Sequence, residues 1–344
     1  MQDDSDKRTG IIAAGNWIID HIKVIDIYPV QDSLANIKEE SISNGGSPYN
    51  ILKNLAKLNA SFPLRGIGLV GDDDFGKQIK SDCANHGINA TTIKILSQTP
   101  TSYTDVMTVA SSGRRTFFHQ RGANAFLDIG DFDFSTASEK LFHLGYLLLL
   151  DALDKIYEDG TSGASRVLNL ACQSGLKTSV DIVSEDSNRY KEIILPALPY
   201  INFLFLNEFE AGRCTGVNLT SDQPGYAALN KAATNILDCG VREWVFIHFS
   251  KGVFAKSKSG EILIQGSVDL PSEKVVSVLG AGDALASGIL YALHEGWTVS
   301  DALRLGVCSA ASCLQELSSS KGILSFDKCL KLEENYNYIH LEKS

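Results

Sequence analysis

The sequence lacks the cysteine and histidine spacings that mark disulfide frameworks and zinc sites. Its 344 residues include seven cysteines, an odd number with no C-x-x-C pair, and seven histidines with no H-x-H or H-E-x-x-H spacing. We therefore expect reduced, mostly buried thiols, as in a cytoplasmic protein, and we predict no zinc site.

Long apolar runs and an excess of positive charge are also missing. The longest apolar runs, such as residues 147–150, are far too short to span a bilayer. The chain starts with MQDDSDKRTG, which is too acidic and polar for a signal peptide. The formal net charge of −10 argues against nucleic acid or an anionic membrane as the main partner. A nucleotide remains possible, because local groups can hold it.

Short apolar segments alternate with helix-like ones along most of the chain. The length predicts about two domains or one large α/β domain. The runs typical of buried parallel strands are residues 11–14, 141–145, 178–182, 200–206 and 244–249.

Residues 66–71 match the dinucleotide-binding pattern G-x-G-x-x-G, but their surroundings do not. That fingerprint needs a strand before its first glycine and an acidic residue about 20 residues later. Here the apolar residues lie inside the motif, and residues 91–94 are Thr-Thr-Ile-Lys. The segment is predicted to be a strand, and an NAD-dependent oxidoreductase is an alternative that depends on this pattern alone.

The most informative stretch is residues 277–283, which read Ser-Val-Leu-Gly-Ala-Gly-Asp. A strand-like segment ending at residue 276 precedes it, and residues 284–293 are small and apolar at helical spacing. We therefore expect a strand to turn into a helix at Gly280, Ala281 and Gly282.

Such a turn can bind an anion and place a base beside it. Main-chain N–H groups at a helix start are unpaired and the helix dipole favours negative charge, while glycines let a ligand approach closely. Asp283 would stand in the first helical turn, where it could take the proton from a hydroxyl that attacks a bound phosphate. The alternative is an ordinary strand-to-helix turn with an aspartate cap.

Two N-terminal segments carry further candidates for binding. Asp20 follows the first predicted strand, in the pattern G-N-x-x-x-D, as either a turn residue or a ligand for substrate hydroxyls. The segment Gly45-Gly46-Ser47-Pro48-Tyr49-Asn50 predicts a helix start with Ser47 as N-cap. Its glycines would bring the backbone close to a ligand, and Asn50 can both donate and accept.

These two glycine-rich segments resemble the signatures of the ribokinase-like (PfkB) carbohydrate kinases. Gly45, Gly46 and Asn50 match the N-terminal signature, and Gly280-Ala281-Gly282-Asp283 followed by A-x-A-x-G matches the C-terminal one. The resemblance implies an α/β protein with a three-layer α/β/α fold, a mostly parallel central sheet and a small β-lid. It places the kinase domain at 11–331, the lid at about 20–43 and 98–120, and tails at 1–10 and 332–344.

The resemblance also implies an activity and roles for individual residues. An ATP-dependent kinase would transfer the γ-phosphoryl group to a hydroxymethyl group, with Asp283 as general base and the amides of residues 280–282 as anion hole. Ribose, fructose, a keto-deoxy sugar acid and a nucleoside all fit as acceptor. The residues that would contact the sugar are Asp20, Gly45, Gly46, Asn50 and Asn124.

The implied nucleotide site includes Asn207, Ser250, Gly252, Gly280 and Gly282. Asn207 and Glu210, in the pattern N-x-x-E, would help to hold Mg²⁺; equally, they could be a helix start with acids favoured by the dipole. Lid segments in this family often pair between subunits, so a homodimer through the lid is expected.

Three positions depart from the family pattern. His248 and Ser250 stand where a Thr and a Gly usually contact the nucleotide, and Ser277 replaces an Asp that helps to fix a monovalent cation. These departures weaken the implied nucleotide contacts and K⁺ activation. They favour the alternative of a non-catalytic sugar- or nucleotide-binding regulator on the same fold, whereas the retained Asp283 and Glu210 favour an enzyme.

Overall fold

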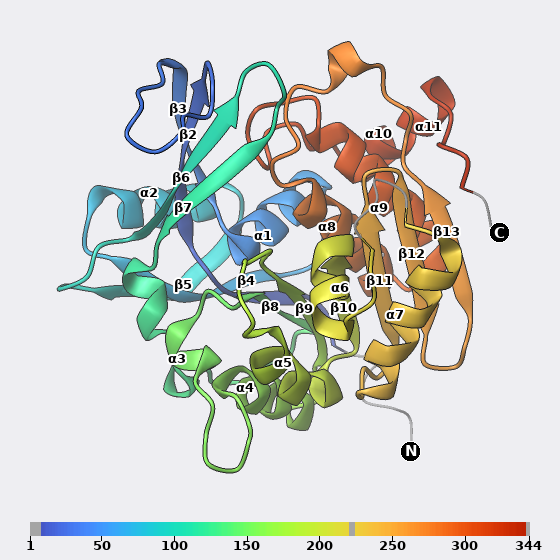
Figure 1. Ribbon diagram of the computed structural model, residues 1–344. Coiled ribbons are helices and arrows are strands. Elements are labelled where there is room, and N and C mark those ends of the chain that lie inside the picture. Colours follow the sequence, from blue (N-terminus) through green and yellow to red (C-terminus); the bar gives the residue numbers. More distant parts are fainter. Residues whose placement is uncertain (1–7, 220–223, 342–344) are drawn as a thin grey trace.

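A nine-stranded sheet forms the centre of the protein in the computed structural model, which describes residues 8–219 and 224–341 (Figure 1). In chain order its strands are β1 (Ile11–Gly15), β4 (Leu64–Gly71), β5 (Ile88–Leu96), β8 (Leu141–Leu147), β9 (Lys177–Ile182), β10 (Phe203–Asn207), β11 (Trp244–Phe249), β12 (Gly252–Ser257) and β13 (Ile262–Gly266). Their order in the sheet is β13-β12-β11-β10-β9-β8-β1-β4-β5. Neighbours are parallel from β5 to β11, whereas β11–β12 and β12–β13 are antiparallel.

Helices cover both faces of this sheet and give the predicted three-layer fold. Their bounds are α1 (Ser47–Lys57), α2 (Asp74–Asn85), α3 (Asp151–Asp154), α4 (Gly163–Gln173), α5 (Tyr190–Ile194), α6 (Glu208–Thr215), α7 (Tyr226–Asp238), α8 (Ala281–His294), α9 (Val299–Cys313), α10 (Phe326–Leu330) and α11 (Leu332–Asn335). One core cluster contains residues of α1, α2, α8, α9 and α10, and the other contains residues of α3 to α7. Alternate residues of β1 contribute to different clusters: Ile12 and Ala14 to one, Ile11 and Ala13 to the other.

A separate four-stranded sheet, here called the lid, projects from the main body at the upper left of Figure 1. Its strands are β2 (Ile18–Ile25), β3 (Ile37–Gly45), β6 (Ser102–Val109) and β7 (Arg115–Gln120), in the order β3-β2-β6-β7. Only Asn16 and Trp17 separate the carboxyl end of β1 from β2. The lid therefore starts at the carboxyl edge of the central sheet.

Trp17 explains the glycine-rich strand β4. A side chain at Gly66 or Gly68 would come within 2.7 or 2.2 Å of the Trp17 ring, and the indole Nε1–H donates to the Ile67 carbonyl at 2.9 Å. The segment is a strand, as predicted, and its glycines make room for a buried tryptophan.

Two local predictions are wrong. No strand precedes Gly280: residues 275–279 form an irregular segment in which Val276 and Val278 are exposed. The N–H groups of Val276 and Ser277 donate to the Leu314 carbonyl near the end of α9, at 2.8 and 3.2 Å, and so hold the segment outside the sheet. Ser47 is not a cap, because the N-cap of α1 is Gly46 and the Ser47 hydroxyl points to other partners.

The described ends of the chain contact the domain. The Arg8 guanidinium donates to the carbonyls of Ala137 and Ser174, and the N–H of Ile339 donates to the Ser267 carbonyl at 2.8 Å. The remainder of the predicted tails, 1–7 and 342–344, lies outside the described residues.

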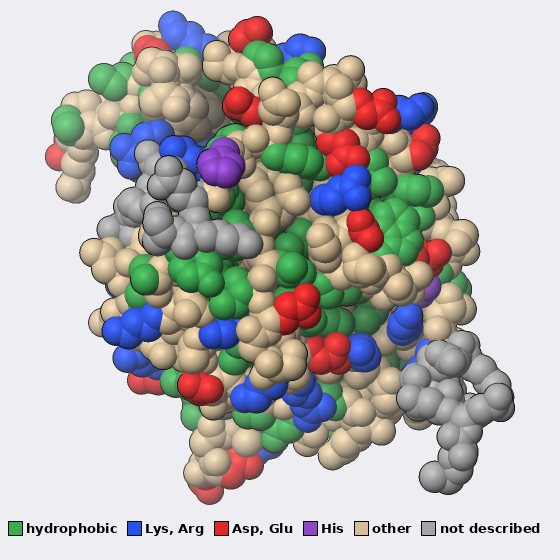
Figure 2. All heavy atoms as spheres, turned by 90° about the vertical axis from the view of Figure 1, so that its right-hand side faces the viewer, with side chains coloured by type: hydrophobic (Ala, Val, Ile, Leu, Met, Phe, Trp, Pro, Cys, Tyr) green, Lys and Arg blue, Asp and Glu red, His purple; other side chains and the backbone are tan. Residues whose placement is uncertain are grey.

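The helices of the described ranges include none that is long and apolar enough to cross a bilayer. On the face shown in Figure 2, positive and negative side chains are interspersed with hydrophobic ones. All seven cysteines are free thiols, and five of them are buried.

Candidate active site

Segments far apart in the sequence meet at the carboxyl ends of the central strands. The starts of α1 and α8 lie beside the ends of β8 and β9, and the first residues of β2 join them from the lid. In open parallel sheets this edge is where ligands bind.

The start of α8 lies where the sequence predicts a helix to begin. Its N-cap, Gly280, has a φ of 75°, and a Cβ there would lie 2.5 Å from that of Ser319; the position therefore requires glycine. The first N–H groups of a helix have no partner within it, and that of Ala281 makes a long hydrogen bond of 3.5 Å to the Val278 carbonyl. The first turn of α8 therefore offers donors to an anion, and it also carries Asp283.

Two side chains hold the Asp283 carboxylate. The Asn50 amide donates to Oδ2 at 2.7 Å, and the Tyr146 hydroxyl lies 2.8 and 3.0 Å from the two oxygens. The Ser319 hydroxyl donates to the side-chain Oδ1 of Asn50 at 2.8 Å and thereby fixes the orientation of the Asn50 amide. The carboxylate is thus aimed by residues of α1, β8 and the loop after α9.

Burial and neighbouring carboxylates disfavour negative charge in the site. Burial raises the pKa of Asp283 well above its ordinary value, and the negative charge of Asp181 adds to the rise, while the bonds from Asn50 and Tyr146 oppose it. Burial also raises the pKa of Asp20 to about 7, against an opposing effect of Arg115. Each shift favours the protonated acid in the unliganded protein.

Asp181 was missed as a site residue. It lies near the end of β9 and accepts hydrogen bonds from the Ser47 hydroxyl at 3.0 and 3.1 Å. His143, fully buried, contacts Ser47 at 2.8 Å and Ser179 at 2.9 Å. The signal for Asp181 in the sequence is its place near the end of the predicted strand 178–182, because ligands bind at the carboxyl ends of parallel strands. Tyr146 gave no comparable signal, because it lies within β8 and only the fold brings that strand beside the start of α8.

The glycines at 45 and 46 make room for polar groups. A Cβ at Gly45 would lie 2.0 Å from the Asp20 carboxylate, and one at Gly46 would lie 1.9 Å from the Asn16 carbonyl oxygen. Asp20 itself is buried, with 8% exposure. Gly45, Gly46 and Asp20 therefore form one tight junction between the lid and α1.

The Asn124 side chain is bonded to the backbone where β1 passes into β2. Its amide accepts from the Trp17 N–H at 3.2 Å and donates to the Trp17 carbonyl at 3.1 Å. Because the side chain is fully buried and bonded to the backbone, we assign it to holding the junction of β1 and β2 instead of contacting the sugar.

Asn207 and Glu210 form a reciprocal capping box at the start of α6. The Glu210 carboxylate accepts from the Asn207 N–H and amide and from Ser184, each at 2.8 Å. Burial raises the pKa of Glu210 to about 8. Over residues 8–219 and 224–341, no group of three or more His, Cys, Asp or Glu side chains is arranged to hold a metal directly. The oxygens of both side chains are already bonded within this capping box.

The departures from the signature lie around the β11–β12 turn and before α8. His248 lies against the start of α8, where a Cβ at Gly282 would be 3.2 Å from its ring. Ser250 is exposed in the turn, and Gly252 pairs with Gly266 on β13. The Ser277 hydroxyl accepts from the Leu279 N–H at 3.1 Å.

Comparison with known proteins identifies the family. Residues 13–324 match the model for the pfkB family carbohydrate kinases. Curated relatives include ribokinase of Haemophilus influenzae, 25% identical with 95% of this chain and 99% of that protein covered. 5-dehydro-2-deoxygluconokinase of Clostridium beijerinckii is 24% identical, with 94% of each chain covered.

Solved structures share the fold. Arabidopsis thaliana ribokinase complexed with ribose and ATP has a TM-score of 0.75 at 21% identity, covering 94% of this chain and 98% of that one. Burkholderia thailandensis nucleoside kinase in complex with inosine has a TM-score of 0.73 at 15% identity, covering 96% and 100%.

The chain therefore belongs to the PfkB family of carbohydrate kinases. It is a phosphotransferase that acts on a hydroxyl group, with ATP as the nucleotide bound in this family. An enzyme is thus favoured over the binding regulator and the oxidoreductase.

Replacing Asp283 with asparagine tests whether burial raises the pKa of this carboxyl. A raised folded-state pKa means that the folded protein binds the proton more tightly than the unfolded chain, so stability is lost as pH rises from the ordinary aspartate range through the raised value. The Tm of Asp283→Asn should therefore exceed that of the wild type, with a gap that widens from pH 5 to pH 8 in thermal melts. The control is Asp238→Asn at an exposed position of α7, whose Tm should follow that of the wild type. A Tm difference between Asp283→Asn and the wild type that does not change with pH would contradict a raised pKa of Asp283.

Removing the Asn124 amide separates its two possible roles. Asn124→Ala leaves the buried N–H and carbonyl of Trp17 unpaired, so the free energy of unfolding in urea should fall by about 1–3 kcal/mol. The KM for the sugar should stay near the wild-type value. Asn85→Ala, at an exposed position at the end of α2, should change neither quantity. A raised KM at unchanged stability would restore Asn124 to the sugar site.

Proposed function

We propose that this protein transfers the γ-phosphoryl group of ATP to a hydroxymethyl group of a sugar, sugar acid or nucleoside. The observation that carries the proposal is Asp283, a buried carboxylate held by Asn50 and Tyr146 in the first turn of α8. Its relatives include a ribokinase and a 5-dehydro-2-deoxygluconokinase, and their names support a sugar or sugar acid as acceptor.

The proposed step needs one base and one set of donors. Asp283 accepts the proton of the acceptor hydroxyl as its oxygen forms a bond to the γ-phosphorus and the bond to the bridging oxygen of ADP breaks. The N–H groups of Ala281 and Gly282, with the helix dipole, stabilise negative charge on the transferred group. Gly280 allows this geometry, because its φ of 75° suits a residue without a side chain.

The acceptor is proposed to lie between the lid and α1. Asp20 would accept hydrogen bonds from sugar hydroxyls, and the backbone of Gly45 and Gly46 would allow a close approach. Asn50 would give one amide hydrogen to Asp283 and present the other to the substrate, which would orient the attacking hydroxyl relative to the base.

Mg²⁺ and the nucleotide are assigned to the neighbouring strand ends. Asn207 and Glu210 would hold the waters of Mg²⁺ without direct ligation, and the ion would neutralise phosphate charge. The β11–β12 turn, with Ser250 and Gly252, would face the nucleotide. The proposal includes no K⁺, because the Ser277 hydroxyl brings no negative charge and is bonded to the Leu279 N–H.

Removing the base tests the assignment of Asp283. Asp283→Ala and Asp283→Asn should lower kcat by about 10²- to 10⁴-fold in an ADP-release assay over a panel of sugars, sugar acids and nucleosides. Circular dichroism should show an intact fold, and Asp238→Asn should keep wild-type kcat. A near-normal kcat in either Asp283 variant would exclude this residue as the base.

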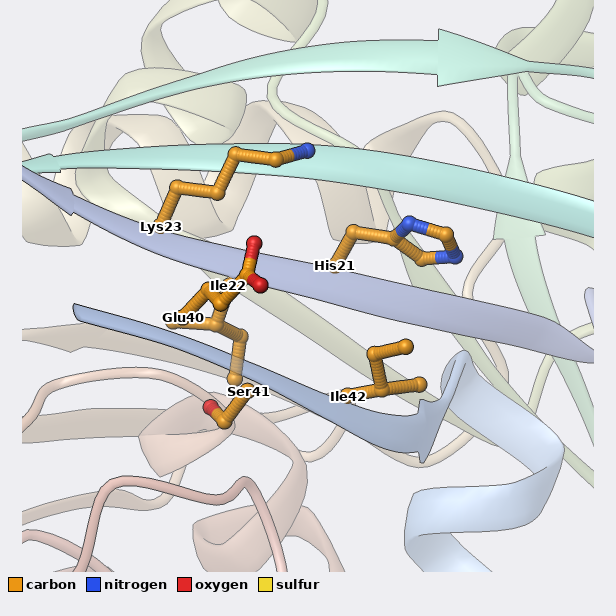
Figure 3. Close-up of a pocket in the computed structure, with 6 residues that line it drawn as sticks. All are labelled: His21, Ile22, Lys23, Glu40, Ser41 and Ile42. Carbon is orange, nitrogen blue, oxygen red and sulfur yellow. The ribbon is translucent and has the colours of Figure 1, made fainter. Parts of the chain in front are cut away.

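The lid is proposed to pair with the lid of a second copy. Exposed large apolar residues gather there, on β3, on β7 and in the β2–β3 loop: Ile27, Tyr28, Val30, Leu34, Ile37, Ile42 and Phe118. A cavity of about 380 Å³ lies beside them, lined by His21, Ile22, Lys23, Glu40, Ser41 and Ile42. Figure 3 shows His21 and Lys23 projecting from the same side of β2, opposite to Asp20 by strand alternation. A partner there would leave the substrate side of the lid free.

A charge on the edge strand tests this interface. Ile42 is 56% exposed on β3, so Ile42→Glu should cost little within one subunit but place a carboxylate in an apolar contact between two. Sedimentation velocity at micromolar protein should show a wild-type dimer and a mutant monomer, with exposed Leu170→Glu on α4 as the control. A monomeric wild type would refute the pairing.

A further inference from the structure

One face of the lid carries a row of polar side chains directed at the candidate active site. The register aligns Asp20 on β2 with Thr104 on β6, and Thr104 with His119 on β7. Because side chains alternate along a strand, Phe117 and Arg115 share this face. The Thr104 hydroxyl and the His119 ring are 2.9 Å apart, which fixes the end of the row nearest the site.

Arg115 differs from the other cations of this region. Lys23 pairs with Asp105, and Arg121 lies 3.3 Å from Asp151. Across the part of the chain that the structure describes, no carboxylate comes within ion-pair distance of the Arg115 guanidinium. It is partly buried and lies over the Phe117 ring, 5.6 Å from the centroid. A partly buried guanidinium without a carboxylate partner can bind an anion from a ligand.

Strand register sets Arg115 opposite Thr108 on β6, which lies opposite Val24 on β2, so Arg115 stands four residues beyond Asp20 on the same face of the lid. Two groups of the site act electrostatically on its guanidinium. They are Asp20 and Cys313; the Cys313 thiol lies 3.4 Å from the Leu279 carbonyl oxygen, just before the start of α8. Arg115 does not neutralise Asp20, since burial still raises the pKa of that carboxyl to about 7. The positive charge therefore remains available to a ligand between the lid and α8.

We propose that Arg115 binds a carboxylate of the phosphoryl acceptor, so that the preferred substrate is a sugar acid and not a neutral sugar or a nucleoside. The inference rests on the proposed kinase function. A substrate carboxylate buried near Asp20, Asp181 and Asp283 would be costly unless a cation lay beside it. A guanidinium can bind a carboxylate through two parallel N–H···O bonds, which also orients the acceptor.

Kinetics with matched acceptors tests the proposal. The wild type should give a kcat/KM at least about tenfold higher for a 2-keto-3-deoxyaldonic acid than for ribose, fructose or inosine, the discrimination expected of one charged bond. Arg115→Met should raise the KM for the sugar acid about 10- to 100-fold with little change in kcat or in the KM for ATP. Arg115→Lys should recover part of this loss, and exposed Arg114→Met, beside it in the sequence, should match the wild type.

Several results would overturn the inference. A raised KM for ATP in Arg115→Met would assign the guanidinium to the nucleotide, and equal losses on acidic and neutral acceptors would assign it a structural role. A wild type that prefers neutral sugars would also reject it. If the protein phosphorylates none of these compounds, the proposed function fails. Calorimetry then tests the carboxylate site separately. Sugar-acid binding by the wild type that is lost in Arg115→Met supports that site, and no binding refutes it.

Discussion

The structure depends on one contact between distant parts of the chain, the hydrogen bond from Asn50 to Asp283. It joins the first turn of α1 to the first turn of α8 at 2.7 Å, and Ser319 and Tyr146 complete its geometry. A base that rotated freely would spend most of its time away from an acceptor hydroxyl, whereas a carboxylate fixed by two donors is oriented before the substrate arrives. Residues of α1, α8, β8 and the loop after α9 meet at this contact.

The same contact lies in an environment that opposes charge. Asp283 shares the site with Asp181 and Asp20, and burial raises the pKa of both Asp283 and Asp20. Hydrogen bonds to a carboxylate favour its ionised form, so Asn50 and Tyr146 counteract part of this rise. A site of this kind lowers the stability of the folded protein in order to hold a base, as is common where activity and stability conflict.

The sequence predicted the parts of the site that belong to local patterns. Asp283 lies in the first turn of a helix after Gly280, and β11 has the predicted bounds, because turn glycines and buried strands leave local signals. It could not predict Tyr146 or the true role of Asn124, because these depend on contacts between segments more than 100 residues apart. Ser47 was misassigned for the same reason: a serine at a helix start is usually a cap, and only the fold brings Asp181 within its reach.

Chemistry and selectivity are divided between the two sheets. The residues that hold the base come from α1, α8 and the carboxyl ends of central strands, where buried packing fixes their positions. Arg115 and the Thr104–His119 pair belong to the lid, whose strands β6 and β7 are largely half-buried or exposed. A substitution on β7 can therefore change the charge presented to an acceptor without disturbing the packing around Asp283. The residue proposed to recognise the acceptor, Arg115, therefore lies outside the packed residues that hold Asp283.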